Sequence, residues 1–195
     1  MAYIDPSKRL DWLSTLTQFN WATYVLGKID VDAAANPAQL VKPRHMFFGQ
    51  GEPGDKDDGM HAPWSQLGDG KVYINPTWGE RKPKAKAGDP PMPPMPCFYP
   101  LSQWVMKMHG EASRGASVFF VGPAHTDRKW FHHYIAHASA FCLLEKRIEF
   151  RLPEMDPKAK SQPGQAHLAA LWTEDGGELD RFCERMGNHG LVVEP

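Results

Sequence analysis

The chain has 195 residues, of which 42% are hydrophobic, and its formal net charge is -1 at pH 7. This length and composition predict one globular domain over residues 1–195 and exclude a disordered chain. The near-neutral charge excludes a protein that coats DNA through an overall positive excess, so any contact with nucleic acid has to come from local basic segments.

Cysteine usage and hydropathy exclude two further classes. Cys97, Cys142 and Cys183 lie at no ligand-like spacing, which argues against a disulfide scaffold or a zinc site and is typical of a reducing compartment. No apolar run is long enough to span a membrane, and residues 1–12 lack the apolar core of a signal peptide. We expect a soluble, cytoplasmic protein with neither a membrane partner nor a metal.

The amino-terminal part of the chain predicts one helix followed by a short strand. The segment 7–27 begins with a polar cap, and its apolar residues at helical spacing, Leu16, Phe19 and Tyr24, favour a helix that ends at Gly27. The segment 28–36, KIDVDAAAN, favours a strand that ends in acidic and small residues.

A second strand is expected at residues 72–74, VYI. Its β-branched and aromatic residues favour a strand, and the Gly-Asp-Gly before them is typical of a turn. Pro76 cannot donate a hydrogen bond to a sheet, so the strand has to stop with Asn75 at its carboxyl end. Farther along, residues 81–96 contain four cations and then a proline cluster, which predicts an exposed, mobile loop.

The second half of the chain predicts alternating helices and strands. A helix at 100–115 begins with proline and is closed by glycine, and the apolar run at 116–127 favours a strand covered on both faces. The remaining expected elements are a helix at 128–138, a strand or hairpin arm at 139–152, a strand (or alternatively a helix) at 165–172, and a final helix at 177–190. This alternation predicts an α/β domain with a central, largely parallel sheet flanked by helices.

Two strand ends carry residues that could bind a ligand. At the first, Asp30 and Asp32 are two residues apart, which places them on the same face of a strand, and both are candidates for cofactor binding. An acid at a strand end can accept a hydrogen bond from an ammonium or a ribose hydroxyl, and the alanines after it let a cofactor approach the backbone. The glycine-rich dinucleotide fingerprint is absent, and capping of the next segment by one of the acids is an equal alternative.

At the second strand end, Asn75 and the carbonyl of Pro76 present two hydrogen-bond acceptors side by side, and Trp78 adds a flat aromatic surface. This combination suits a planar ligand with an exocyclic amine, such as an adenine or cytosine flipped out of a helix. The alternative is an ordinary Asn-Pro turn after a strand.

Several charged residues are candidates for contact with nucleic acid. Arg81, Lys82, Lys84 and Lys86 follow the second strand end closely and could contact phosphates, or they could form a solvated linker. We interpret His125, Asp127 and Arg128 as lining a base or phosphate channel at the end of the 116–127 strand. Arg147 could contact phosphate or pair with an acid. Adjacent histidines at 132 and 133 face different ways on a helix, so a metal site is not expected.

The order of these segments resembles the phage-type, Dam-like DNA adenine-N6 methyltransferases. NPTW at 75–78 stands where that family has Asn-Pro-Pro-Tyr. Further segments match the family's elements in the same order: DWLST at 11–15 its Trp-x-Thr-Pro, GKIDVDAAANP at 27–37 its Ile-Asp-Leu-Asp-Pro-Ala-Ser, KDDGMHAPW at 56–64 its Glu-Asp-Asp-Gly-Leu and tryptophan, VFFVGPAHTDRKWFHHY at 118–134 its Pro-Ala-Arg-Thr-Asp-x-x-Trp-Phe-His, and EKRIEF at 145–150 its Gly-Arg-Ile-x-Phe.

The resemblance implies a Rossmann-like methyltransferase fold, S-adenosyl-L-methionine as methyl donor, DNA as partner, and a phage or prophage protein acting in a bacterial host. It implies that Asn75 and Pro76 hold the target amino group and that Trp78, after Thr77, stacks on the flipped base. The residues that it assigns to the methyl donor are Asp32, Ala33 and Ala34 at the amino-acid and ribose end, Asp58 near the adenine, and Trp12, Ser14 and Thr15 on the methionine side.

The chain departs from the family at Thr77 and Trp78, which replace a proline and a tyrosine, and at Thr15, where a proline is usual. Stacking should survive because base–aromatic stacking is worth about 1–3 kcal/mol per base and tolerates a change of ring. The expected function is methyl transfer to N6 of adenine in DNA. The alternatives are transfer to N4 of cytosine, and a catalytically impaired methyltransferase-like protein that binds DNA or senses the cofactor.

Overall fold

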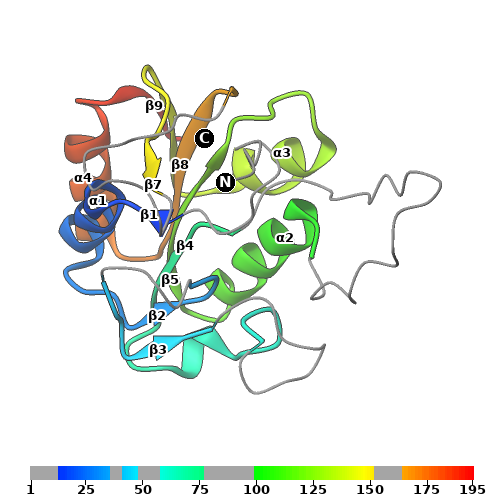
Figure 1. Ribbon diagram of the computed structural model, residues 1–195, viewed down its shortest axis with the longest axis vertical. Helices are drawn as coiled ribbons and strands as arrows, with labels where there is room; N and C mark the ends of the chain where they lie inside the picture. Colours follow the sequence, from blue (N-terminus) through cyan, green and yellow to red (C-terminus); the bar gives the residue numbers. More distant parts are fainter. Residues whose placement is uncertain (1–12, 36–40, 48–57, 77–98, 152–163) are drawn as a thin grey trace, which may run out of the picture.

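The computed structural model describes residues 13–35, 41–47, 58–76, 99–151 and 164–195. These residues form an α/β fold in which helices cover both faces of a seven-stranded mixed sheet (Figure 1). In the part of the chain so described, no helix combines the length and the apolar character needed to cross a membrane.

The central sheet is parallel in one half and antiparallel in the other. In spatial order its strands are β3 (His45–Met46), β2 (Val31–Asp32), β4 (Lys71–Ile74), β5 (Ser117–Pro123), β8 (His167–Trp172), β6 (Ala140–Leu144) and β9 (Gly190–Val193). The pairings from β3 to β5 are parallel, whereas β8 is antiparallel to both β5 and β6, and β9 is antiparallel to β6. The expectation of a largely parallel sheet therefore holds only for the half from β3 to β5.

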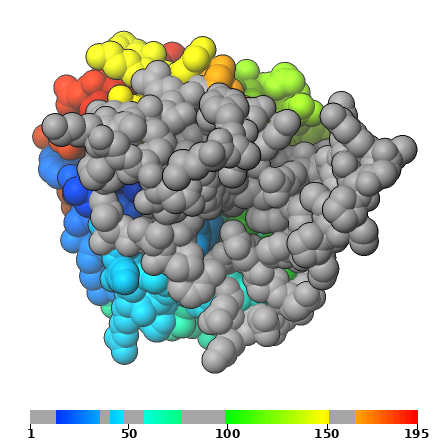
Figure 2. All heavy atoms as spheres, viewed as in Figure 1, coloured from blue at the N-terminus to red at the C-terminus, as the bar shows by residue number. Residues whose placement is uncertain are grey.

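Among the described residues, four α-helices flank the sheet. They are α1 (Leu16–Leu26), α2 (Leu101–Ala112), α3 (Lys129–Tyr134) and α4 (Gly176–Met186), with 3-10 helices η2 (Trp64–Gln66) and η3 (Ile135–His137) beside them. Helices α1 and α4 cover one face, and α2 and α3 cover the other (Figure 1). In Figure 2 the cyan segment around β3 and the yellow segment after β6 lie at opposite ends of the molecule, as the strand order requires.

Helix α1 ends where the sequence predicts but begins later. Its C-cap is Gly27 at φ 76°, and Thr15 and Gln18 form a capping box at its start. Residues 13–14 belong instead to β1 (Leu13–Ser14). Of the apolar residues that favour this helix, Phe19 is buried, whereas Leu16 and Tyr24 are 51% and 42% exposed.

Alternation along the strands divides the core into two clusters. Val72 and Ile74 pack on the side of α2, whereas Tyr73 between them packs on the side of α1. All seven residues of β5 are buried, which confirms the prediction of a strand covered on both faces. The segment 165–172, for which a helix was the alternative, is the strand β8.

Segment 139–152 contains two strands that do not form a hairpin. Residues 140–144 form β6, which pairs with β8 and β9. Phe150 and Arg151 form β7, which pairs antiparallel with β1 so that Ser14 lies opposite Phe150. This pairing fixes the segment before α1 next to the chain that leaves β6. Strand β9 was not among the predicted elements.

Replacing His167 by asparagine is expected to flatten the pH dependence of stability between pH 7 and 4. His167 is 1% exposed, and its Nδ1 accepts a hydrogen bond from the Ile148 N–H at 3.3 Å. Burial, with added repulsion from Arg147 and His125, lowers the pKa of His167 to about 4. The unfolded chain, with a histidine pKa of about 6.5, then binds more protons than the folded chain between these values.

This stabilisation is present above the unfolded pKa and is lost as the pH falls toward the folded pKa. Urea denaturation at a series of pH values should give the wild type a slope steeper than that of His167→Asn by up to about 1.4 kcal/mol per pH unit. His137→Asn, at an exposed position, is the matched control and should keep the wild-type slope. Identical slopes for wild type and His167→Asn would contradict the prediction.

Candidate functional site

The two strand ends singled out from the sequence lie next to each other. Strand β2 has β3 on one side and β4 on the other, so the chain reverses its direction of travel across the sheet between β2 and β4. In open α/β sheets ligands bind at the carboxyl ends of the strands beside such a switch point. Asp32 lies opposite Tyr73, and the Ala33 N–H donates to the Tyr73 carbonyl at 3.2 Å. Asp32 and Asn75 therefore belong to one edge of the sheet.

Asn75 has one half of its amide engaged and the other half without a partner. Its Nδ2 donates to Ser14 Oγ at 2.9 Å. Its Oδ1 is buried, and no hydrogen-bond donor among the described residues reaches it. Leaving a buried acceptor unpaired costs about 1–3 kcal/mol, and folded proteins pair nearly all such groups. The unpaired oxygen at this strand end, beside a switch point, could accept a hydrogen bond from a ligand that carries a donor.

Ser14 connects Asn75 to the core. Its Oγ accepts a second hydrogen bond from the Tyr73 hydroxyl at 2.8 Å. Burial raises the pKa of the Tyr73 phenol far above its usual value, and the nearby Asp32 carboxylate raises it further, against the opposing effect of the bond to Ser14. Tyr73 therefore remains a protonated donor. The predicted cofactor residue Ser14 is thus in direct contact with the predicted catalytic residue Asn75.

Asp32 shapes the turn that follows β2. Its side chain is buried, and Oδ1 accepts a hydrogen bond from the Ala34 N–H at 3.2 Å. Ala33 is fully buried, whereas Ala34 is partly exposed. Asp32, Ala33 and Ala34 thus lie together at the carboxyl end of β2, as the sequence predicts, with a small side chain at the exposed position.

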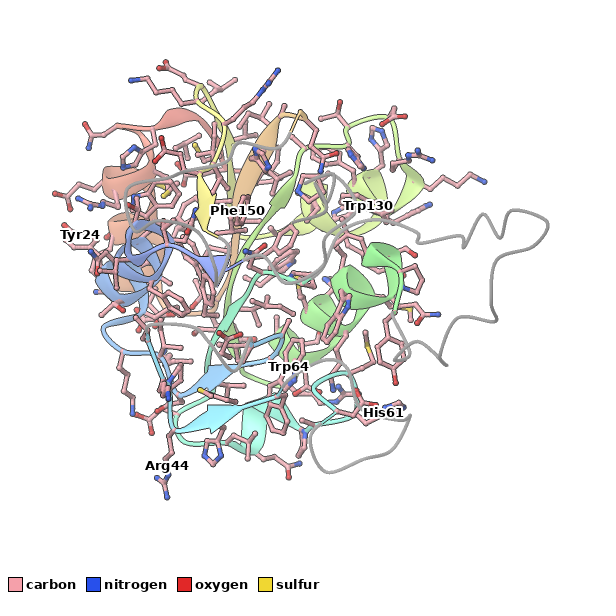
Figure 3. All side chains as sticks on the ribbon, viewed as in Figure 1. Tyr24, Arg44, His61, Trp64, Trp130 and Phe150 are labelled. Carbon is pink, nitrogen blue, oxygen red and sulfur yellow. The ribbon has the colours of Figure 1, made fainter. Side chains whose placement is uncertain are left out.

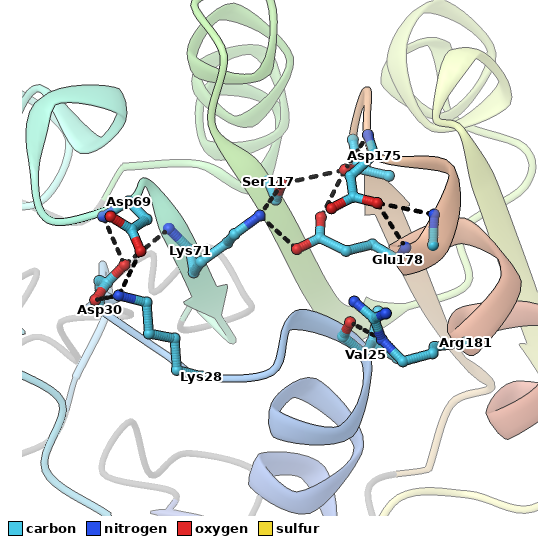
Figure 4. Close-up of polar contacts among 11 residues, drawn as sticks. Val25, Lys28, Asp30, Asp69, Lys71, Ser117, Asp175, Glu178 and Arg181 are labelled. Carbon is cyan, nitrogen blue, oxygen red and sulfur yellow. Dashed lines mark hydrogen bonds and ion pairs between the residues drawn. The ribbon is translucent and has the colours of Figure 1, made fainter.

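Asp30 lies at the opposite, amino end of β2 (Figure 4). Its carboxylate accepts a hydrogen bond from the Asp69 N–H at 2.9 Å and pairs with Lys28 at 3.2 Å. Burial alone would raise the pKa of Asp30, but these contacts hold it below its usual value. Because each strand residue advances the chain by about 3.3 Å, the acid two residues before Asp32 is carried away from the carboxyl edge. The structure does not bring Asp30 to the site.

Asp58 organises the loop that approaches the carboxyl end of β2. Its carboxylate is buried, and Oδ1 accepts from the Met60 N–H at 2.9 Å. Oδ2 lies 2.6 Å from His61 Nδ1 and 2.7 Å from the Tyr99 hydroxyl. His61 lies at the outer end of this loop and Trp64 farther inside (Figure 3). Sequence reasoning did not single out His61 or Tyr99; the histidine three residues after Asp58 was the available signal.

Gly59 brings this loop into contact with β2. A Cβ added at Gly59 would lie 1.9 Å from the Ala33 carbonyl oxygen and 2.9 Å from the Phe47 Cβ. The loop backbone and the end of β2 are therefore too close for any side chain at this position. This contact joins Asp58 to the edge that carries Asp32 and Asn75.

Gly59→Ala is expected to lower the unfolding free energy by about 1–3 kcal/mol, the usual cost of forcing an extra carbon into a packed site. The clash is with backbone, which cannot rotate away as a flexible side chain can. Urea denaturation monitored by tryptophan fluorescence measures the change. Gly110→Ala is the matched control, because only the tip of Arg114 lies within 4 Å of the added carbon and alanine is the better helix former. A Gly59→Ala variant as stable as wild type would disprove the close contact.

The predicted nucleic-acid residues that the structure describes lie at the same edge of the sheet. His125, Asp127 and Arg128 follow the carboxyl end of β5, and Arg147 follows the carboxyl end of β6, which runs in the same direction. His125 Nε2 lies 3.1 Å from Gln165 Oε1. Asp127 and Arg128 are exposed and form a loose ion pair at 3.7 Å.

Several predictions fall on residues outside the described ranges. They concern Trp12, Thr77 and Trp78, the basic residues Arg81, Lys82, Lys84 and Lys86, the loop at 81–96, and Cys97.

Metal-ligating and thiol side chains form no metal-binding cluster and no disulfide among the described residues. Over the described ranges, no group of three or more His, Cys, Asp or Glu side chains is arranged to hold a metal ion. Cys142 and Cys183 are free thiols. Burial raises the pKa of Cys142 to about 11 and raises that of Cys183 as well, so both remain protonated and weakly nucleophilic near neutral pH.

Asn75, Ser14, Asp32 and the Asp58 loop together make a small polar site at the carboxyl edge of the parallel strands. Its distinguishing feature is the unpaired amide oxygen of Asn75 at the end of β4, with the buried carboxylates of Asp32 and Asp58 at and beside the end of β2. Comparisons of the chain with family models, with curated proteins and with solved structures give no match.

Proposed function

We propose that this protein is a DNA methyltransferase that transfers the methyl group of S-adenosyl-L-methionine to the exocyclic N6 of a flipped adenine. The observation that carries this proposal is the buried, unpaired Oδ1 of Asn75 at the carboxyl end of β4. The resemblance of the surrounding NPTW segment to the Asn-Pro-Pro-Tyr of Dam-like enzymes gives that oxygen its role.

An amino group on a planar base is the donor that this strand end suits best. The amide oxygen of Asn75 can accept one of its hydrogens, and the carbonyl of Pro76 follows directly in the chain to accept the other. Holding both hydrogens would stabilise the positive charge that develops on the nitrogen as the bond to the methyl carbon forms and the methyl–sulfur bond breaks, after which one amino proton leaves to solvent. Trp78, two residues on, would stack on the base.

The residues at the end of β2 fit S-adenosyl-L-methionine. The donor carries a cationic amino-acid group and a ribose, and the buried carboxylates of Asp32 and Asp58 are the acceptors that such groups require. Ala34, which is partly exposed, places only a methyl group at this end of β2, so that a ligand could approach the backbone there. When bound, the donor supplies the activated methyl group. The mixed sheet is compatible with the Rossmann-like fold that this function needs.

Contact with DNA would come from the same edge. Arg128 and Arg147 are exposed beyond the ends of β5 and β6, and His125 lies near them. Their cations would contact phosphates and so position the strand, while Asn75 engages the flipped base. The local placement of these cations is consistent with a chain whose net charge is only -1.

Nucleoside mass spectrometry tests this function directly. Unmethylated duplex DNA is incubated with the purified protein and methyl-labelled S-adenosyl-L-methionine, then digested. We expect labelled N6-methyladenine. Labelled N4-methylcytosine would keep the role of Asn75 but change the base. Absence of label, together with calorimetric binding of the donor, would favour a non-catalytic binding protein. Absence of both label and binding would overturn the proposal.

A further inference from the structure

We propose that Ser14 is a positioning residue that fixes the side-chain amide of Asn75 with its oxygen available to the target amine. This inference rests on the function proposed above and assigns Ser14 a role other than contact with the methyl donor. It follows from the hydrogen bonds that join Tyr73, Ser14 and Asn75.

The three side chains form a connected set. Ser14 Oγ accepts from the Tyr73 hydroxyl at 2.8 Å and from Asn75 Nδ2 at 2.9 Å. Ser14 and Tyr73 are both buried, and the bond from Tyr73 is a buried one. The amide nitrogen of Asn75 is therefore linked through Ser14 to the buried Tyr73. The amide oxygen has no hydrogen-bond partner among the described residues.

The backbone that carries Ser14 is held from both sides. Ser14 lies opposite Phe150 in the β1–β7 pair, and Gln18 in the first turn of α1 donates to the Glu149 carbonyl at 3.1 Å. These contacts connect the start of α1 to the chain between β6 and β7. Ser14 Oγ is thus a fixed point rather than a mobile surface hydroxyl, which a positioning role requires.

An asparagine side chain needs such a tether because its amide rotates about χ2 with little steric preference. Without Ser14 Oγ, neither Asn75 Nδ2 nor the Tyr73 hydroxyl has its acceptor, and the amide can turn to satisfy its own nitrogen. A displacement of about 1 Å in a catalytic group can cost a hundredfold in rate. The loss would appear in the chemical step and not in the binding of the donor.

Ser14→Ala is therefore expected to lower kcat about 10- to 100-fold, with the Kd of S-adenosyl-L-methionine unchanged within about twofold. Ser14→Thr keeps a hydroxyl at the same position and should recover most of the rate. Ser117→Ala is the matched control: Ser117 is also buried and bonds Lys71 and Thr173 at 3.1 Å, but it lies at the amino end of β5. Its kcat should stay at the wild-type value.

A readout independent of turnover separates this inference from the proposed function. In the full-length protein, the side-chain NH2 protons of Asn75 should exchange with solvent at least tenfold faster in Ser14→Ala than in wild type, as measured by NMR. If wild type methylates DNA but Ser14→Ala keeps its kcat, or instead loses donor binding, the positioning role is wrong. If wild type does not methylate DNA, the proposed function fails. If, in addition, the Asn75 side-chain NH2 protons exchange at the same rate in Ser14→Ala as in wild type, the positioning role is wrong as well.

Discussion

Asn75→Ala is expected to lower the rate of methyl transfer by about 10²- to 10³-fold, the usual effect of removing one preorganised hydrogen-bonding group from a catalytic site. The substitution removes the oxygen that has no partner within the described structure and leaves the Pro76 carbonyl as the remaining acceptor. Since one of two contacts to the amino group is lost, the nitrogen is held less firmly. The rate is measured by transfer of labelled methyl to duplex DNA.

Binding of S-adenosyl-L-methionine should survive this change, because Asp32 and the Asp58 loop are untouched. Isothermal titration calorimetry should give Asn75→Ala a Kd within a few-fold of the wild type. Asn188→Ala is the matched control: its Nδ2 donates to the Glu184 carbonyl at 3.0 Å, at an exposed position just after α4. Equal rates for wild type and Asn75→Ala would rule out the catalytic role of Asn75.

Glu178→Ala is expected to lower the unfolding free energy by about 3–5 kcal/mol, because it breaks a buried ion pair and leaves the other charge behind. The Glu178 carboxylate is 1% exposed and pairs with Lys71, whose side chain is 20% exposed (Figure 4). Glu178 also accepts a hydrogen bond from the Thr173 hydroxyl at 2.6 Å. In the variant Lys71 loses its anionic partner while keeping the hydrogen bond to Ser117, and the Thr173 hydroxyl loses its carboxylate acceptor, so the loss exceeds that of a simple truncation.

Urea denaturation measures this loss, with Glu184→Ala as the matched control. Glu184 lies on the same helix but is exposed, and its bond to the Tyr24 hydroxyl is at the surface, so its removal should cost less than about 1 kcal/mol. The Lys71–Glu178 pair lies at the amino end of β4, away from Asn75. Folded Glu178→Ala should therefore keep the wild-type kcat. A loss of stability no larger than that of Glu184→Ala would refute the prediction.

The parts of the fold that follow from local chemistry could be predicted. Val72, Tyr73 and Ile74 favour a strand wherever they are placed, and Pro76 ends it in any context, so the position of Asn75 was accessible from the sequence. The end of α1 at Gly27 is set by a left-handed backbone conformation that glycine adopts easily. In each case, neighbouring residues decide the outcome.

The parts that depend on contacts distant in sequence could not be predicted. Ser14 and Asn75 are separated by 61 positions, and no sequence pattern in either segment predicts their hydrogen bond. The direction of β8 depends on where the chain re-enters the sheet, so the sheet is mixed although the helices and strands alternate. Strand β2 has only two residues, Val31 and Asp32, so Asp30 precedes it and lies at its amino end rather than beside Asp32 at the carboxyl end.

We propose that the carboxyl end of β2 and the Asp58 loop bind S-adenosyl-L-methionine beside Asn75 at the end of β4. Hydrogen–deuterium exchange of the full-length protein with and without this compound tests it most directly. We predict added protection of backbone amides at 31–35, 58–62 and 73–76. We predict no change at 173–178, which lies at the opposite edge of the sheet, where β4 and β5 begin; we call this the amino edge. Protection confined to the amino edge, or no protection at saturating concentration, would contradict the claim.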